Sequence, residues 1–255
     1  MVRQQLVLSL FPGIGILDTA FEAKGFCIVR GPDLLWGGDV KRFHPPSGAF
    51  SGVIGGPPCQ AHSRLVHIVR HRYGEASVAE DLIPEFIRVV DEARPTWWVM
   101  ENVESAPIPD LDGYKIHASI LNNRWLGGEQ SRKHRFSFGT SDGRPLHFSE
   151  GLTAIDNPAW APRVLASGAI HYTDGPTNQH GKGNRRLHTL GHATWANLSR
   201  ALELQGLPPD HLKHCPFTAK AAHKVIGNAV AYPIALCLAA AVLDALQRNP
   251  ALIAT

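Results

Sequence analysis

Cysteine is sparse and unpaired in this chain of 255 residues. Its four cysteines are scattered along the sequence, and no two of them form a C-x-x-C motif. This spacing argues against a disulfide framework and against a zinc site, and it is typical of proteins from a reducing compartment. We therefore expect neither disulfides nor a bound metal ion.

Long hydrophobic runs are also missing. No segment approaches the roughly 20 apolar residues that cross a membrane as a helix, and Pro12 and two glycines interrupt the apolar stretch near the N-terminus. That stretch lacks the layout of a secretory signal peptide. The composition, with 44% hydrophobic and 18% charged residues, predicts a globular protein built on one large domain. We expect a cytoplasmic monomer that has no contact with a membrane.

Acidic residues are scarce in one part of the chain. Between Asn157 and Arg200 the only acid is Asp174, against five basic residues and four histidines. Residues 62–72 hold three arginines, three histidines and no acid. Both patches suit contacts with phosphate groups, although the net charge is only +3. Solvated loops are the alternative interpretation of each.

Short apolar runs alternate with helical patterns over most of the chain. We expect strands at residues 5–10, 26–30, 52–54, 96–100 and 135–139, and helices at residues 16–23, 79–93, 117–123 and 229–246. The helix at 79–93 carries Glu80 and Asp81 in its expected first turn. This alternation predicts an α/β fold with a doubly wound, mostly parallel sheet.

The pattern changes between residues 146 and 217. Gly, Pro, Asn and His become frequent there, and the hydrophobic periodicity fades. We interpret this stretch as a small irregular insert, and residues 1–145 together with 218–255 as the main domain. A short helix at residues 198–207 is expected to lead back from the insert.

A glycine loop separates the first expected strand from the first expected helix. Gly13 and Gly15 in Phe11-Pro12-Gly13-Ile14-Gly15 permit a tight turn, and the following helix offers free amides to an anionic group. The third glycine of a dinucleotide fingerprint is absent. The loop therefore indicates a nucleotide-like cofactor only weakly.

Two aspartates follow the second expected strand. Asp33 and Asp39 each come where a carboxylate can meet ribose hydroxyls or an adenine amine. Either residue could equally well be a turn or capping aspartate.

Cys59 follows the apolar run at 52–54, directly after Pro57 and Pro58. A thiol at the carboxyl edge of a strand, behind two rigid prolines, is placed like a nucleophile, although a lone cysteine is more often a small buried hydrophobe. The basic residues that follow are expected to lower its pKa and so to raise the thiolate fraction.

Glu101 ends the strand of bulky apolar residues at 96–100. The carboxyl ends of parallel strands are where ligands bind. A partly desolvated glutamate at that edge can act as a general acid. A plain surface glutamate at the end of a strand is the alternative.

Seven segments, in this order, resemble motifs of the cytosine-C5 methyltransferases that use S-adenosylmethionine, and together they span most of the chain. They are Phe11-x-Gly13-x-Gly15, Gly38-Asp39, Pro57-Pro58-Cys59-Gln60, Glu101-Asn102-Val103, Gln130-Ser131-Arg132, Leu204-Gln205-Gly206-Leu207-Pro208 and Ile226-Gly227-Asn228-Ala229-Val230.

The resemblance implies a Rossmann-like methyltransferase fold and a covalent mechanism. Cys59 would add to carbon 6 of the base, and Glu101 would protonate the ring nitrogen beside the exocyclic amine. Arg132 would hold the base carbonyl or the cysteine loop, and Asn102 would support the geometry of that loop. The target base has to be flipped out of the duplex before it can react.

The resemblance also assigns binding residues and a partner, double-stranded DNA in the nucleoid of a bacterial or phage-infected cell. Residues 146–217 would recognise the target sequence. Cofactor contacts are expected from Phe11, Gly13, Gly15, Asp33, Asp39, Pro57, Asn228 and Val230. Contacts with the base or the DNA are expected from Gln60, Ser63, Arg64, Asn102, Arg185, Arg186 and Gln205.

Several positions depart from the family pattern. Ser9 stands where an acid usually precedes Leu-Phe, and Pro32 stands near the usual acid after the second strand, with Asp33 beside it. His134 stands where the second arginine of Gln-x-Arg-x-Arg is expected. The segment before Asp39 is short, so a helix is expected to be missing there.

Three alternatives remain open at this point. The first is methylation of tRNA cytosine, since relatives that act on tRNA resemble the DNA enzymes. The second is a catalytically weak methyltransferase-like protein that binds DNA, which the departures at Ser9 and His134 would suit. The third is a nicotinamide oxidoreductase, which rests on the glycine loop alone and leaves Cys59 and Glu101 unexplained.

Overall fold

A computed structural model describes residues 6–63, 66–75, 78–149, 151–152, 161, 163–164, 170–171 and 198–248. Six strands form one mixed sheet in the order β2-β1-β3-β4-β6-β5. They are β1 (Leu6–Leu10), β2 (Cys27–Arg30), β3 (Gly52–Gly55), β4 (Trp97–Asn102), β5 (Lys115–Asn122) and β6 (Lys133–Thr140). All pairs from β2 to β4 are parallel, while β6 pairs antiparallel with both β4 and β5. Only β6 runs against the other strands of this sheet, which confirms the mostly parallel arrangement.

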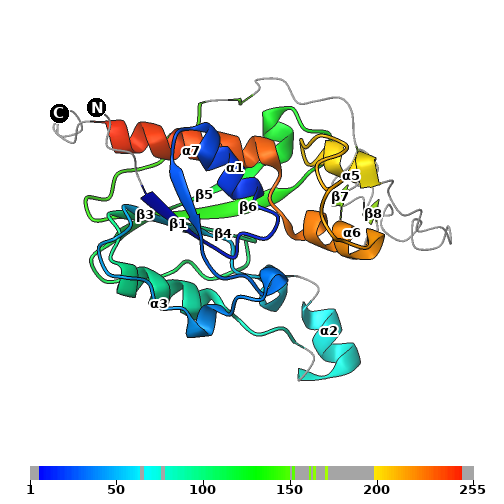
Figure 1. The fold of residues 1–255 in the computed structure, drawn as a ribbon, viewed down its shortest axis with the longest axis horizontal. Coiled ribbons are helices and arrows are strands. Elements are labelled where there is room, and N and C mark those ends of the chain that lie inside the picture. The colour runs from blue at the N-terminus through cyan, green and yellow to red at the C-terminus, as the bar shows by residue number, and fades with distance from the viewer. Residues whose placement is uncertain are drawn as a thin grey trace.

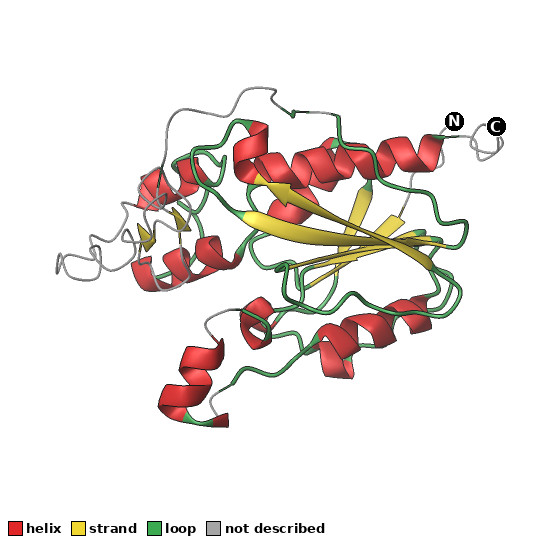
Figure 2. Ribbon diagram, turned by 180° about the vertical axis from the view of Figure 1, so that it is seen from behind, coloured by secondary structure: helices red, strands yellow, loops and turns green. Residues whose placement is uncertain are grey.

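Helices cover both faces of the sheet, as expected for a doubly wound fold. Helices α1 (Ile16–Ala23) and α7 (Tyr232–Gln247) lie on one face, and α3 (Ile83–Ala93) lies on the other (Figures 1 and 2). Beyond one end of the sheet lie α5 (Leu198–Leu204), α6 (Ala219–Asn228) and a two-stranded sheet of β7 (Arg163–Val164) and β8 (Ile170–His171). Helix α2 (Val66–Tyr73) projects from the body of the molecule.

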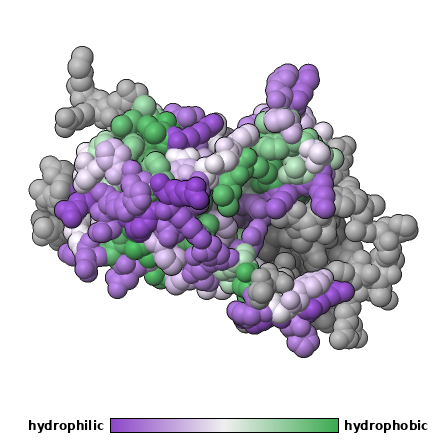
Figure 3. All heavy atoms as spheres, turned by 60° about the horizontal axis from the view of Figure 1, so that its bottom comes forward, coloured by the Kyte–Doolittle hydropathy of each residue, from purple (hydrophilic) through white to green (hydrophobic). Residues whose placement is uncertain are grey.

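Two hydrophobic clusters fill the two faces. Successive residues of a strand point to opposite faces, so Trp97 packs with Phe21 and Phe26 under α1, whereas Trp98 packs with Phe86 of α3. All five of these side chains are buried. The exposed side of α3 is polar, and the surface over it is largely hydrophilic (Figure 3).

Gly139 makes room for the ring of Trp98. A Cβ added at Gly139 would lie 2.2 Å from Cε2 of the indole, which is far inside van der Waals contact. We therefore expect Gly139→Ala to lower the free energy of unfolding by about 1–3 kcal/mol or more. Chemical denaturation measures this change.

A control for that substitution lies two residues away on the same face of β6. Ser137 is fully buried, and its hydroxyl has no hydrogen-bond partner among the described residues. Ser137→Ala should stay within about 0.5 kcal/mol of the unchanged protein, because it removes no satisfied interaction. Equal effects of the two substitutions would refute the steric argument.

One expected helix is a strand instead. Residues 117–123 were predicted to be helical, but β5 covers Lys115–Asn122 and pairs with β6 over its whole length. The apolar residues Ile116, Ala118 and Ile120 alternate with polar ones, which is the period of a strand. Pairing with a neighbouring strand outweighs the local helical preference.

Two expected helices begin later than predicted, and for the same reason. The predicted helix at 79–93 begins at Ile83, with Pro84 in its first turn, and the predicted helix at 229–246 begins at Tyr232, with Pro233 in its first turn. Proline disfavours helical geometry in the residue before it and suits the first helical position. The acids Glu80 and Asp81 therefore precede α3 rather than lie in its first turn.

The expectation that no segment approaches a membrane span was too strict. The stretch Ala219–Gln247 is long and apolar enough to cross a membrane by length and composition. The chain leaves helical geometry between α6 and α7, however, and Ile234, Leu238 and Val242 of α7 are fully buried in the core. Figure 1 shows α7 lying along α1. These contacts are those of a core helix.

Residues 31–51 hold only two 3-10 helical turns, η1 (Leu34–Trp36) and η2 (Val40–Arg42). The helix that was expected to be missing before Asp39 is indeed missing, and β2 is an edge strand of the sheet.

Most of residues 146–217 lies outside the described part of the chain, so the division into a main domain and an insert stays a prediction. The helix expected at 198–207 is confirmed as α5.

Candidate active site

The cysteine loop follows β3 at the carboxyl edge of the sheet. Cys59 opens the 3-10 turn η3 (Cys59–Ala61) immediately after Pro57 and Pro58. The Asn102 side chain, at the end of β4, donates from Nδ2 to the carbonyl of Pro57 at 3.1 Å, and its Oδ1 accepts from the amide of Val103. Asn102 is 1% exposed. It therefore ties the cysteine loop to β4, the supporting role expected of it, and it does not face outward toward DNA.

Glu101 precedes Asn102 on β4 and points to the opposite face of the sheet. One of its carboxylate oxygens, Oε1, is hydrogen-bonded to Nδ1 of His134. The other, Oε2, lies against the cysteine loop, since a Cβ added at Gly56 would be only 2.7 Å from it. A glycine at position 56 thus lets the carboxylate approach the loop that carries Cys59.

The strand register explains why Glu101 meets His134. Glu101 lies opposite Phe136 in the antiparallel pair of β4 and β6. His134 comes two residues before Phe136 and therefore faces the same side of the sheet. A diagonal neighbour of this kind is within reach of a long side chain.

Arg132 precedes His134 by two residues and lies just before the start of β6. Its Nε donates to Nε2 of His134 at 3.0 Å, and its two terminal nitrogens donate to the carbonyls of Val164, Gly227 and Ala229 at 2.8–3.1 Å. The side chain is buried, at 8% exposure. Arg132 therefore joins β6 to β7 and to the end of α6, which adds a scaffolding role to the one that the sequence suggested.

Burial raises the pKa of the Cys59 thiol above its ordinary value. The negative charge of Glu101 raises it further, and the positive charge of Arg132 offsets part of the increase. The expected lowering of this pKa is therefore wrong. One of the basic residues after the cysteine, Arg70, is exposed and paired with Glu75 instead of supporting a thiolate.

The glycine loop and the first aspartate form one hydrogen-bonded unit. Phe11, Gly13 and Gly15 all have positive φ angles, between 55° and 79°. Asp33 accepts from the amide of Gly13 at 2.8 Å through one oxygen and from the amide of Leu35 through the other. Asp33 thus caps η1, as one of the two interpretations of this residue predicted. It also lies beside the glycine loop, which is where a cofactor contact would have to be.

Trp36 was not singled out in the sequence. Its indole Nε1 donates to the carbonyl of Gly13 at 2.7 Å, and its ring lies 5.8 Å from that of Phe217. The ring is 55% exposed. An aromatic residue shortly after a predicted site acid was the only signal that could have pointed to it.

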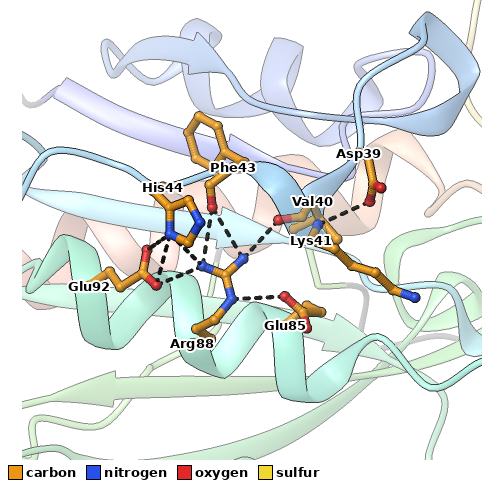
Figure 4. Close-up of polar contacts among 8 residues, drawn as sticks. All are labelled: Asp39, Val40, Lys41, Phe43, His44, Glu85, Arg88 and Glu92. Carbon is orange, nitrogen blue, oxygen red and sulfur yellow. Dashed lines mark hydrogen bonds and ion pairs between the residues drawn. The ribbon is translucent and has the colours of Figure 1, made fainter.

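The second aspartate, Asp39, caps η2 by accepting from the amide of Lys41. Arg88 of α3 holds this turn in place, because its guanidinium donates to the carbonyls of Val40 and Phe43 at 2.8–3.1 Å (Figure 4). The acids Glu85 and Glu92 of α3 pair with the same guanidinium. One arginine thus fixes the short turn that stands where a helix is missing.

The departure at Ser9 is matched by an acid nearby. Ser9 donates from its hydroxyl to Asp18 at 2.5 Å, and Arg30 donates to the other carboxylate oxygen of Asp18 at 2.9 Å. Asp18 is fully buried, and burial raises its pKa, while the two donors act in the opposite direction. The sequence analysis did not single out Asp18, although an acid among the apolar residues of the first expected helix could have pointed to it.

The remaining predicted contacts fall in different places. Gln60 is exposed and Ser63 is half-buried beside the cysteine loop, while Asn228 is exposed and Val230 is buried just after α6. Gln205 is fully buried, with its amide donating to the carbonyl of Ile226, so its assignment as a DNA contact is corrected. Arg64, Arg185 and Arg186 lie outside the described residues.

Comparisons with known proteins point to one family. Residues 38–164 match the family model described as C-5 cytosine-specific DNA methylase. The Type II methyltransferase M.SacI of Streptomyces achromogenes is 30% identical over 155 residues, which cover 55% of this chain and 38% of that protein. The orphan methyltransferase M.SPRI of Bacillus phage SPR is 25% identical over 166 residues, covering 52% and 37%. The chain thus spans less than two fifths of the length of these two relatives.

A solved structure agrees in fold. It is a prophage-encoded E. coli protein described as a DNA modification methyltransferase, with a TM-score of 0.61, 17% identity and coverage of 96% of this chain and 100% of that one. Identity at this level shows the fold alone.

Proposed function

Because the chain belongs to the C-5 cytosine-specific DNA methylase family, we propose that it transfers a methyl group from S-adenosylmethionine to carbon 5 of cytosine in DNA. The observation that carries this proposal is that Glu101 and Cys59 lie close together at the carboxyl edge of the sheet, where the Glu101 carboxylate lies against Gly56 of the cysteine loop. A nucleophilic thiol and a carboxylic acid close to each other are the two groups that addition to a cytosine ring requires.

The glycine loop fits an adenosine-bearing cofactor. Beside Gly13, where a Cβ would stand, no described atom lies within 4 Å, so the loop has open space at its tip. The carboxylates of Asp33 and Asp39 come from neighbouring turns, and Asp39 is 39% exposed on its side chain. Both can accept from hydroxyl or amine groups of the cofactor. When bound, S-adenosylmethionine would supply the methyl group that carbon 5 takes up.

The protein side chains would make the base reactive. The Cys59 thiolate forms a bond to carbon 6, Glu101 gives a proton to the ring nitrogen beside the exocyclic amine, and the ring electron pair becomes available at carbon 5. Once carbon 5 carries the methyl group, loss of its proton to a base expels the Cys59 thiolate, and the ring nitrogen returns its proton to Glu101, which restores the neutral aromatic ring. Carbons 5 and 6 are stacked inside a duplex, so the cytosine must leave the helix first.

The DNA would approach from the side of the cysteine loop. Gln60 is exposed there, and α2 follows it with the exposed residues Arg70 and Arg72. We propose that this surface contacts the phosphate backbone and that residues 146–217 choose the sequence. The relatives from a bacterium and a phage support action on DNA in the cytoplasm of a bacterial or phage-infected cell, and we propose a monomer.

Bisulfite sequencing tests the proposal. DNA from a host without cytosine methylation that expresses the protein should contain unconverted cytosines at one recurring short site. Cells that express Cys59→Ser supply the control and should show none. Complete conversion of host DNA, together with methylation of tRNA by the purified protein, would replace the proposal by the tRNA alternative. Cofactor binding without turnover on either nucleic acid would favour the non-catalytic binder.

A further inference from the structure

His134 lies between the two charged groups of the site and uses both ring nitrogens. Nε2 faces the Nε–H of Arg132 at 3.0 Å, and Nδ1 is hydrogen-bonded to Oε1 of Glu101. The side chain is 7% exposed. A guanidinium can only donate, so Nε2 must be the acceptor and the imidazole proton must sit on Nδ1. The result is a directed chain of donors from Arg132 through His134 to Glu101.

We propose that His134 is a positioning residue that holds Glu101 by one carboxylate oxygen and leaves the other free to act on the base. This inference rests on the proposed function. It gives His134 a role at the position where the family pattern has an arginine.

The geometry of Glu101 supports a division of labour between its two oxygens. Oε1 is occupied by Nδ1 of His134, while Oε2 points at Gly56 in the cysteine loop. Without the bond to His134 the carboxylate could rotate about its last side-chain bond, and neither oxygen would be fixed. Preorganised groups of this kind contribute to catalysis because no reorientation is needed during the reaction.

The contact with Arg132 fixes which nitrogen of His134 carries the proton. The Arg132 guanidinium and the Glu101 carboxylate contact the imidazole of His134, and the charges of both act on the Cys59 thiol. The ring of Phe136 lies 6.5 Å from the imidazole. A second proton on Nε2 would point at the Nε–H of Arg132 and would set two cations against each other. Nδ1–H therefore donates to Oε1 of Glu101, while Arg132 contacts the opposite nitrogen of the ring.

Two substitutions separate positioning of Glu101 from simple support of Arg132. In His134→Asn the side-chain amide replaces Nδ1, so the donor to Glu101 is kept and the acceptor for Arg132 is lost. In His134→Gln the amide reaches the place of Nε2, so the acceptor is kept and the donor is lost. If His134 positions Glu101, the asparagine variant should keep most of kcat, and the glutamine variant should lose about ten- to a hundredfold.

A structural role alone predicts the reverse order, because Arg132 also anchors β7 and the end of α6. His134→Gln would then exceed His134→Asn in kcat and in thermal midpoint. Equal activity of both variants and of the unchanged protein would also overturn the proposal. KM for a duplex DNA substrate should change little, since His134 is not placed at the DNA surface.

Alkylation of Cys59 by iodoacetamide gives a readout that does not depend on methyl transfer. The charge of Glu101 raises the pKa of the Cys59 thiol, so displacement of the carboxylate should change the pH profile of alkylation. The profile should move in His134→Gln and stay in place in His134→Asn. If the unchanged protein methylates no DNA, the proposed function fails, but this comparison still decides whether His134 positions Glu101.

Discussion

Replacing Cys59 by serine should abolish methyl transfer to DNA, with a loss of at least about a thousandfold in kcat. A serine hydroxyl ionises far less readily than a thiol, so the bond to carbon 6 no longer forms. Transfer of the labelled methyl group from S-adenosylmethionine to duplex DNA measures the loss. Cofactor binding should persist, because Cys59 lies on the cysteine loop and not on the glycine loop.

Cys215→Ser is the matched control for this substitution. Cys215 is a free, half-buried cysteine like Cys59, but it packs against the hydrophobic core away from Glu101. It should retain activity within a few fold. Full activity of Cys59→Ser, or equal loss in both variants, would remove Cys59 from the mechanism.

Replacing Glu101 by glutamine should move catalysis and thiol reactivity in opposite directions. Loss of the acid should lower kcat by about 10²- to 10⁴-fold, the usual contribution of a general acid. The same change removes a negative charge that raises the pKa of the Cys59 thiol. The thiolate fraction at a given pH should therefore increase, and iodoacetamide should alkylate Cys59 faster than in the unchanged protein.

The sign of the pH dependence follows from the same contacts. Burial and the charge of Glu101 raise the pKa of Cys59, so the alkylation rate of the unchanged protein should still be increasing at alkaline pH. In Glu101→Gln the curve should shift to lower pH. The exposed Glu104→Gln provides a control, because Glu104 lies near Lys133 and not near the thiol. If both kcat and the alkylation rate of Cys59 decreased in Glu101→Gln, the prediction that the two change in opposite directions would be wrong.

Local patterns predicted the elements that depend on local preferences. Helix α1 has the bounds expected from its periodicity, and the buried strands β1, β3 and β4 follow short apolar runs. The failures occur where distant partners decide the outcome. β5 is a strand because β6 lies beside it, and Gln205 is interior because the end of α6 covers it.

The site was predicted as separate residues but not as a network. The strand expected at 135–139 begins at Lys133 in the structure, so His134 and Phe136 lie on one face together with Glu101 of the neighbouring strand, and Arg132 comes just before the strand begins. With the strand placed two residues too late, His134 could be seen only as a departure from a motif. The pKa of Cys59 was predicted in the wrong direction because burial cannot be read from neighbouring charges in the sequence.

The hydrogen bonds of Arg132 also have a consequence for folding. They reach Val164, Gly227 and Ala229, which are 32, 95 and 97 residues away along the chain. Contacts over such separations form late, after local elements have closed the intervening loops. A growing chain therefore carries the thiol and the acid well before it can orient them. The arrangement around Arg132 is complete only when the segment that ends at Ala229 has been synthesised and has packed beside the start of β6.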